Sequence, residues 1–171
     1  MAGIQGRERL QPSLLDRLID REPNRAKDGP EAQVFTPAQL RQAVLRDLAA
    51  LLNTSNLGTI QDLSATPLVA KSTLNYGVPG FAGLFESSAR SNALERKLAD
   101  AIRAFEPRIR PETLRVRSRG TRDDDAVPAL VFEIEGELWA QPVPQQLFLE
   151  TTIEVETRLA VVVETRPGGP R

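Results

Sequence analysis

The side chains in this sequence that could carry chemistry are carboxylates, lysines, serines and one tyrosine. The chain has no histidine and no cysteine. Those absences exclude a Ser-His-Asp triad, a Cys-His pair and any metal site built from imidazole or thiolate. The carboxylates that remain as candidates lie in a Glu-Pro-Arg step, Glu106-Pro107-Arg108, and in an alternating run, Glu133, Glu135 and Glu137.

Glycosidic-bond hydrolysis is the enzyme class that such carboxylates could serve, and it needs two of them about 5–9.5 Å apart. Glu106 could act as the acid if burial raised its pKa. Arg108, two positions later, instead favours the charged carboxylate, and the acids of residues 133–137 share a solvated strand face. Lys71 and Ser72 are adjacent, which is not the spacing of a Ser-Lys nucleophile. We therefore expect no enzymatic activity from these residues.

The Glu-Pro-Arg step has another interpretation, as a binding corner. Pro107 ends the preceding helix, since proline disfavours the helical state in the residue before it. Glu106 and Arg108 are then displayed on a stiff corner, where the Arg108 guanidinium can donate two hydrogen bonds to a carboxylate or to helix carbonyl groups. The acceptor belongs either to a partner protein or to the chain itself, as an internal salt bridge between the helix and the next strand.

Three consecutive aspartates, Asp123 to Asp125, could form part of a cation site. They lack the spaced acids, the glycine and the distal glutamate of a calcium-binding loop. We expect a solvated hairpin loop at these residues, and we predict neither a metal nor a cofactor.

Helical periodicity precedes the corner. Residues 12–21 place leucine and isoleucine at helical spacing and predict a short amphipathic helix. Thr36 begins the clearest helix, because Pro37 follows at the first helical position and Gln39 can complete a capping box. This helix is expected to stop near Asn53. The other predicted helices cover residues 67–72 and 88–105.

From Thr113 onward the apolar period changes from 3.6 to 2, which is the pattern of strands with one buried and one solvated face. The last two strands can form a hairpin across Glu156–Arg158. Helices followed by strands predict an α+β fold, with N-terminal helices packed on a C-terminal four-stranded antiparallel sheet. The predicted strands lie around residues 114–119, 132–138, 147–155 and 158–164.

Charge is segregated along the predicted sheet. Residues 103–122 hold seven arginines and two acids, whereas residues 123–156 hold nine acids and no base. The basic block could be a nucleic-acid surface, but it lacks the aromatic side chains that stack on bases. We favour pairing between neighbouring strands, which would disfavour a wrong register. The expected pairs join Arg115, Arg117 and Arg119 to Glu133, Glu135 and Glu137.

Length and composition fit one domain. The chain has 171 residues, of which 40% are hydrophobic, and a formal net charge of −1. We expect a single domain over residues 12–164, a flexible tail over 1–11 and a disordered tail over 165–171. The sequence shows no apolar run long enough for a signal peptide or a membrane span. A cytoplasmic protein is therefore expected, with no nucleic-acid partner and no membrane insertion.

Four motifs follow one another along the chain and, with the alternating sheet, give residues 12–164 a family resemblance. The motifs are Ser13-Leu14-Leu15-Asp16-Arg17-Leu18, Arg46-Asp47-Leu48-Ala49-Ala50-Leu51-Leu52-Asn53-Thr54, Ser72-Thr73-Leu74-Asn75-Tyr76-Gly77-Val78-Pro79 and Phe105-Glu106-Pro107-Arg108-Ile109. In this order they resemble TssE, the type VI secretion member of a phage baseplate wedge family often labelled lysozyme-like.

The resemblance implies a structural subunit of a contractile injection machine. Such subunits sit in the baseplate at the inner face of the bacterial inner membrane, bound to TssF and TssG with TssK nearby. Glu106, Pro107 and Arg108 would dock on the helical core of the wedge. The C-terminal strands would offer an edge to the sheath subunits TssB and TssC by β-augmentation, and the apolar, proline-free strand 158–164 fits that role. The alternatives are a generic interaction module of phage-tail-like origin and, as the label lysozyme-like suggests, a murein hydrolase.

Overall fold

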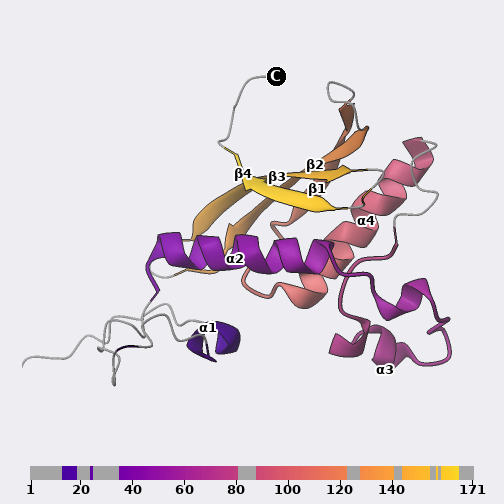
Figure 1. Ribbon diagram of the computed structural model, residues 1–171, viewed down its shortest axis with the longest axis horizontal. Helices are drawn as coiled ribbons and strands as arrows, with labels where there is room; N and C mark the ends of the chain where they lie inside the picture. Colours follow the sequence, from indigo (N-terminus) through magenta and orange to yellow (C-terminus); the bar gives the residue numbers. More distant parts are fainter. Residues whose placement is uncertain are drawn as a thin grey trace, which may run out of the picture.

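The predicted α+β architecture is confirmed in a computed structural model, in which helices pack on a four-stranded antiparallel sheet (Figure 1). The described residues are 13–18, 24, 35–80, 88–122, 128–140, 144–154, 157 and 159–165. The helices are α1 (Leu14–Leu18), α2 (Pro37–Leu52), α3 (Pro67–Ala70) and α4 (Ser88–Phe105), with 3-10 turns at Leu57–Thr59 and Thr73–Asn75. The strands are β1 (Arg115–Arg122), β2 (Ala129–Leu138), β3 (Gln145–Glu154) and β4 (Ala160–Glu164).

Some expectations lie outside the described residues. They are the flexible tail over residues 1–11, residues 12 and 19–21 of the first predicted helix, the loop of Asp123 to Asp125, residues 156 and 158 of the predicted hairpin turn, and all of the C-terminal tail except Thr165.

Helix α2 begins where its capping residues predict. The Thr36 hydroxyl accepts a hydrogen bond from the Gln39 backbone N–H at 3.2 Å, and the Gln39 side chain accepts one from the Thr36 N–H at 2.8 Å. Pro37 fills the first helical position, and Asn53 caps the C-terminal end. The capping box satisfies N–H groups that the first turn of a helix leaves without intrahelical partners.

The core lies between the two long helices and one face of the sheet. Both α2 and α4 lie on the same side of the sheet in Figure 1, with α2 alongside β4 and α4 against β1. The apolar stripes predicted for these helices are buried there, together with the inward residues of the strands. The most fully buried side chains include Leu48, Leu51, Leu94, Leu98, Ile102, Phe132, Ile134, Leu147, Leu149 and Ile153.

The sheet has the strand order β1-β2-β3-β4, so β1 and β4 are its edges. On its solvated face Arg115 lies opposite Glu135 and Arg117 opposite Glu133, which confirms the predicted charge pairing. Arg119 sits in a bulge of β1 and still reaches Glu133, at 2.6 Å between Nε and Oε1.

Glu137 departs from that pairing scheme. Its Oε2 atom lies 3.5 Å from Nη1 of Arg110, which precedes β1. Its Oε1 atom accepts a hydrogen bond from Gln146 Nε2 on β3 at 2.7 Å. The register explains this, because Arg115 already faces Glu135.

The prediction for α1 is right in kind and wrong in orientation. Leu14 and Leu18, expected on the buried face, are 75% and 74% exposed, and Leu15 is 55% exposed. The buried residue is Asp16, at 6% exposure. The helix of five residues is attached to the domain through this carboxylate, so its leucines face outward.

Residues 55–80 form a lobe at one end of α2, containing α3 and the two 3-10 turns (Figure 1). A parallel bridge between Ser55 and Val78 closes the base of the lobe, with the Val78 N–H donating to Thr54 O at 2.8 Å. Gly77 has a φ of +117°, and a Cβ atom there would lie 2.3 Å from the Thr54 carbonyl oxygen. Only glycine fits this close approach without strain.

Candidate partner-binding corner

The corner is built where α4 ends and the chain turns toward the sheet. Helix α4 stops at Phe105, as Pro107 predicts. The Glu106 N–H still donates to Ile102 O at 2.8 Å, and the Ile109 N–H donates to Glu106 O at 3.2 Å. The turn then joins the sheet, because Ile109 bridges Leu138 at the end of β2. Residues 106–109 are therefore held from both sides.

The side chains of Glu106 and Arg108 contact each other, so the internal salt bridge is formed. Arg108 Nε donates to Glu106 Oε1 at 2.6 Å, and Arg108 Nη2 donates to Glu106 Oε2. The Arg108 backbone N–H also donates to Glu106 Oε1, at 3.2 Å. This two-pronged contact uses the planar shape of the guanidinium and fixes its orientation.

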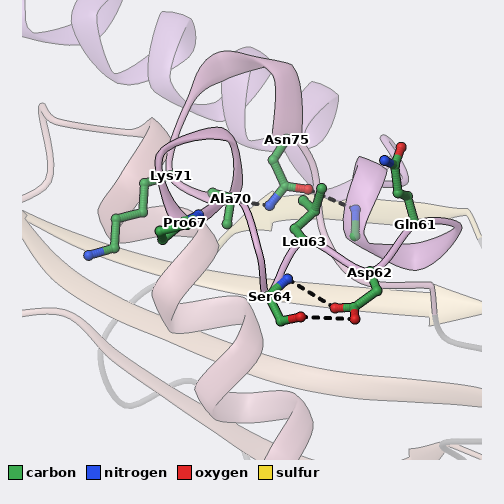
Figure 2. Close-up of a pocket in the computed structure, with 9 residues that line it drawn as sticks. Gln61, Asp62, Leu63, Ser64, Pro67, Ala70, Lys71 and Asn75 are labelled. Atoms are coloured by element: carbon green, nitrogen blue, oxygen red, sulfur yellow. Dashed lines mark hydrogen bonds between the residues drawn. The ribbon is translucent and has the colours of Figure 1, made fainter.

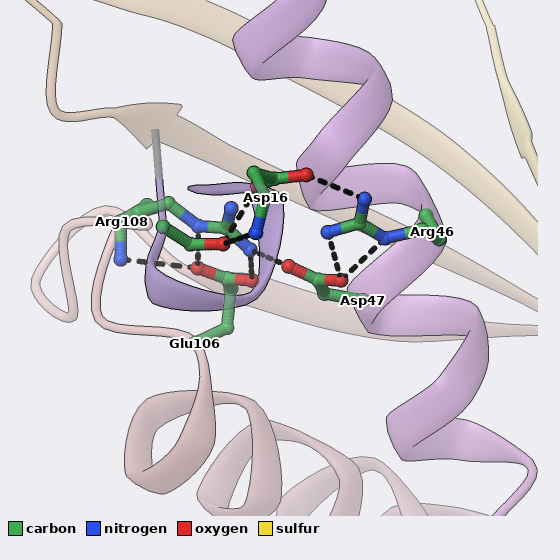
Figure 3. Close-up of polar contacts among 6 residues, drawn as sticks. Asp16, Arg46, Asp47, Glu106 and Arg108 are labelled. Atoms are coloured by element: carbon green, nitrogen blue, oxygen red, sulfur yellow. Dashed lines mark hydrogen bonds and ion pairs between the residues drawn. The ribbon is translucent and has the colours of Figure 1, made fainter. Parts of the chain in front are cut away.

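Arg108 also reaches a second carboxylate, which belongs to α2. Its Nη2 atom donates to Asp47 Oδ2 at 2.6 Å. Asp47 in turn accepts from Arg46, at 2.8 Å from Nε to Oδ1. The corner is thus tied to the middle of α2 by alternating positive and negative side chains (Figure 3).

The chain of charges continues to α1. Arg46 Nη1 donates to Asp16 Oδ1 at 2.6 Å, and the other Asp16 oxygen accepts from the Ser13 hydroxyl at 2.6 Å. The Asp16 side chain is completely buried, whereas that of Arg46 is 39% exposed. Figure 3 shows Asp16 beside the Glu106–Arg108 pair, so one network of five charged side chains joins α1, α2 and the corner.

Three members of the network, Asp16, Arg46 and Arg108, have pKa values shifted in the direction that keeps them charged. The hydrogen bond from Arg46 lowers the pKa of the Asp16 carboxyl, against the opposing effect of burial. The hydrogen bonds to Asp16 and Asp47 raise the pKa of Arg46. For Arg108, burial acts against the charge, but the hydrogen bonds and charges of Glu106 and Asp47 outweigh it, so its pKa is raised.

The three predicted binding residues differ in solvent exposure. Glu106 is buried, at 3% exposure, whereas Pro107 is exposed and the Arg108 side chain is 21% exposed. Trp139 lies beside them. Its backbone N–H donates to Arg108 O at 2.7 Å, and the residue is 63% exposed. Of these four residues, Pro107 and Trp139 are therefore the most exposed, and Glu106 lies buried against the Arg108 guanidinium.

The motif of residues 72–79 supports the corner from the lobe. The Tyr76 ring packs edge-to-face on Phe105, with centroids 5.2 Å apart. Burial, helped by the charges of Asp47 and Glu106, raises the pKa of the Tyr76 hydroxyl. Asn75 accepts from the Gly58 N–H at 2.9 Å and donates to Ala70 O at 2.8 Å. The contacts of Tyr76 and Asn75 described here are thus with other residues of the same chain.

A shallow pocket of about 460 Å³ lies in the lobe, away from the corner (Figure 2). Of the residues that line it, Asp62 alone carries a carboxylate, and both of its oxygens accept hydrogen bonds from Ser64. Lys71 lines the pocket, pointing away from Ser64 in Figure 2. The pocket lacks the pair of carboxylates that glycoside hydrolysis requires.

The described residues hold no group of three or more acidic side chains arranged to bind a metal ion. Within them, no helix has the length and apolar character needed to cross a lipid bilayer.

Sequence reasoning missed several members of this site. Arg46 and Asp47 lie in the second motif, but the sequence does not show that the corner and α1 lie against α2. Only this arrangement lets Asp47 accept a hydrogen bond from Arg108 and lets Arg46 link Asp47 to Asp16. Trp139 carried a signal that could have been read, since it is the single tryptophan and follows a predicted strand directly. Nothing in the sequence marked Asp16 as a member of the site, because its helix was expected to bury leucine side chains.

A comparison with protein families matched residues 38–143 to the family described as baseplate wedge protein gp25. The match covers more than half of the chain. The chain belongs to this family. The matched residues of the baseplate wedge family include α2, the lobe, α4, the corner, β1 and β2, and they end before β3 and β4. Comparison with individual curated proteins gave no match.

Membership confirms the resemblance stated from the four motifs. It identifies the chain as a structural protein of the phage baseplate wedge type, a family of assembly components rather than of known enzymes. It also indicates that the chain interacts with other baseplate components. The corner lies inside the matched residues, and α1 and the edge strand β4 lie outside them.

Proposed function

We propose that this chain is the TssE subunit of a type VI secretion baseplate, on the cytoplasmic side of the bacterial inner membrane. In this proposal it binds the wedge subunits TssF and TssG, close to TssK, and starts sheath assembly by offering a strand edge to TssB and TssC. Its role is to hold partners in position without chemistry of its own. Membership of the baseplate wedge family supports this proposal in general terms.

The observation that carries the wedge-binding part is the neutralised corner. Arg108 and Arg46 are both matched with carboxylates of the same chain, so the corner has no large unbalanced charge to bring into an interface. What it offers outward is Pro107 and Trp139. Exposed aromatic residues on a stiff support are typical anchors of protein interfaces, because little conformational freedom is lost on binding.

The exposed leucines of α1 extend this apolar surface. Leu14 and Leu18 are about three-quarters exposed, and Asp16 between them attaches the helix next to the corner. A partner made of helices, such as the helical core of a wedge, would cover leucine and tryptophan side chains together. Glu106 would contribute by holding Arg108 and the turn in place.

The sheath-binding part is supported by the free edge of the sheet. β4 pairs with β3 on one side, and no described strand pairs with its other side. Its outward side chains, Val161 and Val163, are 54% and 48% exposed. A short apolar edge strand is a template on which another chain can add a strand.

Co-purification tests the wedge role. We would express this chain with the TssF and TssG candidates of its own genome, as wild type and as Glu106→Ala/Arg108→Ala. The matched control is Arg110→Ala/Glu112→Ala, an Arg–Glu pair with the same two-residue spacing that is more exposed, with side chains 43% and 61% accessible.

The proposal expects co-elution of the wild type and of the control, and loss of the folded corner variant. If the control variant also failed to co-elute, any charge pair near α4 would matter for binding, and the corner would have no special role. If the wild type itself binds neither subunit, the baseplate assignment loses its main support and a generic interaction module becomes the better interpretation.

A further inference from the structure

We propose that Asn53 is a register stop for strand addition at β4, so that an incoming strand pairs with Val162 and Glu164 and ends before Ala160. The proposal rests on the proposed role of β4 as a docking edge. It concerns where on that edge a partner strand can begin, which the proposed function leaves open.

The register of the sheet determines which backbone groups of β4 point outward. In an antiparallel pair, alternate residues exchange both of their hydrogen bonds with the partner strand. Beyond the two ends of the β3–β4 ladder, the Thr165 N–H donates to Phe148 O at 2.9 Å and the Glu154 N–H donates to Leu159 O at 3.1 Å. The Leu159 C=O and the Thr165 N–H therefore face β3, and by the alternation of the ladder so do the N–H and C=O groups of Val161 and Val163.

The residues between them turn their backbone groups toward the open side of the sheet. These residues are Ala160, Val162 and Glu164. They are the positions at which another strand could form ladder hydrogen bonds.

The first of these positions is already occupied. The Ala160 N–H donates to Asn53 Oδ1 at 2.8 Å, and Asn53 Nδ2 donates to Ala160 O at 2.8 Å. A primary amide carries the same donor and acceptor as a peptide unit, so Asn53 takes the place of a neighbouring strand at this one residue. Both hydrogen-bonding groups of Ala160 are satisfied before any partner arrives.

Asn53 is held in this position by α2. It is the C-cap residue, its backbone N–H donates to Ala49 O at 3.1 Å, and its Nδ2 donates to the same oxygen at 2.8 Å. α2 lies alongside β4 (Figure 1), and the C-terminal end of the helix lies beside the first residue of the strand. The stop is part of a helix cap and does not depend on a mobile side chain.

The remaining edge defines the occupant as an extended apolar segment of another protein. Val162 and Glu164 offer two N–H and two C=O groups, for which no partner is found among the described residues. Residues of the added strand that lie beside Val161 and Val163 would cover their exposed side chains, and β-branched residues suit such neighbours. A second copy of this chain would bring an edge limited by its own Asn53, so two copies could pair only over these same short stretches.

Residue-resolved amide hydrogen exchange tests the stop without a partner. In the free wild type, the Ala160 amide is expected to exchange slowly, and the Val162 and Glu164 amides fast. Asn53→Ala should speed Ala160 exchange about fivefold to tenfold, the effect of losing one hydrogen bond. Asn53→Asp replaces the donor that the Ala49 and Ala160 carbonyls accept from with a carboxylate oxygen, so it should also speed Ala160 exchange, and it serves as a second variant if the alanine variant folds poorly.

The same measurement with the TssB and TssC candidates of the genome tests the register. In the wild type, added protection is expected at Val162 and Glu164 and none at Ala160. In Asn53→Ala, the protected stretch should extend to Ala160. Protection that reaches Ala160 by displacing Asn53 in the wild type, or a variant stretch that stays at two residues, would overturn the stop.

Failure of the edge itself looks different. Sheath binding without any change at Val162 and Glu164, or no sheath binding at all, would refute strand addition at β4 while the free-protein exchange of Ala160 still reported on Asn53.

Discussion

Arg108 and Asp47 lie 61 positions apart in the sequence, and their side chains meet at 2.6 Å between Nη2 and Oδ2. Through this contact the turn after α4 is fastened to the middle of α2. Glu106 completes the arrangement from beneath, with both of its oxygens on the same guanidinium. The shape of the corner therefore depends on residues from two separate helices.

Removing Glu106 should destabilise the isolated chain. Glu106→Ala leaves Arg108 with one carboxylate instead of two in a mostly buried place. Loss of one partner of a buried ion pair costs about 3–5 kcal/mol, and we expect the lower end because Asp47 remains. Urea unfolding of both proteins measures the difference. Glu112→Ala, which removes an exposed carboxylate nearby, is the control, and equal midpoints for the two variants would show that Glu106 contributes nothing special.

Gly77→Ala should damage the lobe. The residue has a φ of +117°, and the new methyl group would press on the Thr54 carbonyl oxygen. The left-handed conformation alone costs about 1–2 kcal/mol for a residue other than glycine, and the clash adds to it. Gly58→Ala is the matched control in the same lobe, since its Cβ would meet nothing closer than 3.5 Å. A thermal midpoint that falls equally in both variants would contradict this account.

Attachment of α1 should weaken in acid. The hydrogen bond from Arg46 lowers the pKa of Asp16 from its ordinary value of 3.8, so the folded form binds its proton less readily than the unfolded form. The stabilisation is therefore complete above that value and is lost as the pH falls through the lower, folded-state pKa. An NMR titration of the Asp16 carboxyl measures this, and Arg46→Ala should move the inflection upward. An inflection at the ordinary value in the wild type would mean that the ion pair is not formed in solution.

Trp139 should matter for binding and little for folding. Its residue is 63% exposed, so Trp139→Ala should change the free energy of unfolding by less than about 0.5 kcal/mol. If it is an interface anchor, affinity for the wedge subunits should fall by about 30-fold or more, the effect of about 2 kcal/mol. Ile60→Ala, at a residue 85% exposed in the lobe, is the control. The single tryptophan also gives a fluorescence signal, and a wedge complex that leaves its emission unchanged would place the interface elsewhere.

Local rules predicted the parts of the fold that local rules determine. The capping box at Thr36, the helix end before Pro107 and the alternation of the strands depend on residues close in sequence. The charge rows predicted which strand faces lie together, but not the exact register. Pairing all three residues of each row would place Arg115 opposite Glu137, whereas the sheet places Arg115 opposite Glu135 and Arg117 opposite Glu133.

What escaped prediction depends on contacts between distant residues. The leucines of α1 suggested a buried face, and nothing in that segment reveals that Asp16 is the buried residue or that its carboxylate pairs with Arg46. Asn53 is predictable as a helix end, but its contact with Ala160 spans 107 positions. Glu106 illustrates the same limit, since the residues alone allowed either a partner or Arg108 as its acceptor site.

The bridge between Ser55 and Val78 has a consequence for how this protein can vary. A segment whose two ends are already hydrogen-bonded to each other can be lengthened, shortened or exchanged at a small entropic cost, because the closure lies at its base and not at its tip. Exposed Ile60, Leu68 and Leu74 lie on the segment that is free to change in this way. Related proteins could thus acquire new contacts by grafting a different loop between residues 57 and 75, while Tyr76 stays packed on Phe105 and the framework beneath is unchanged.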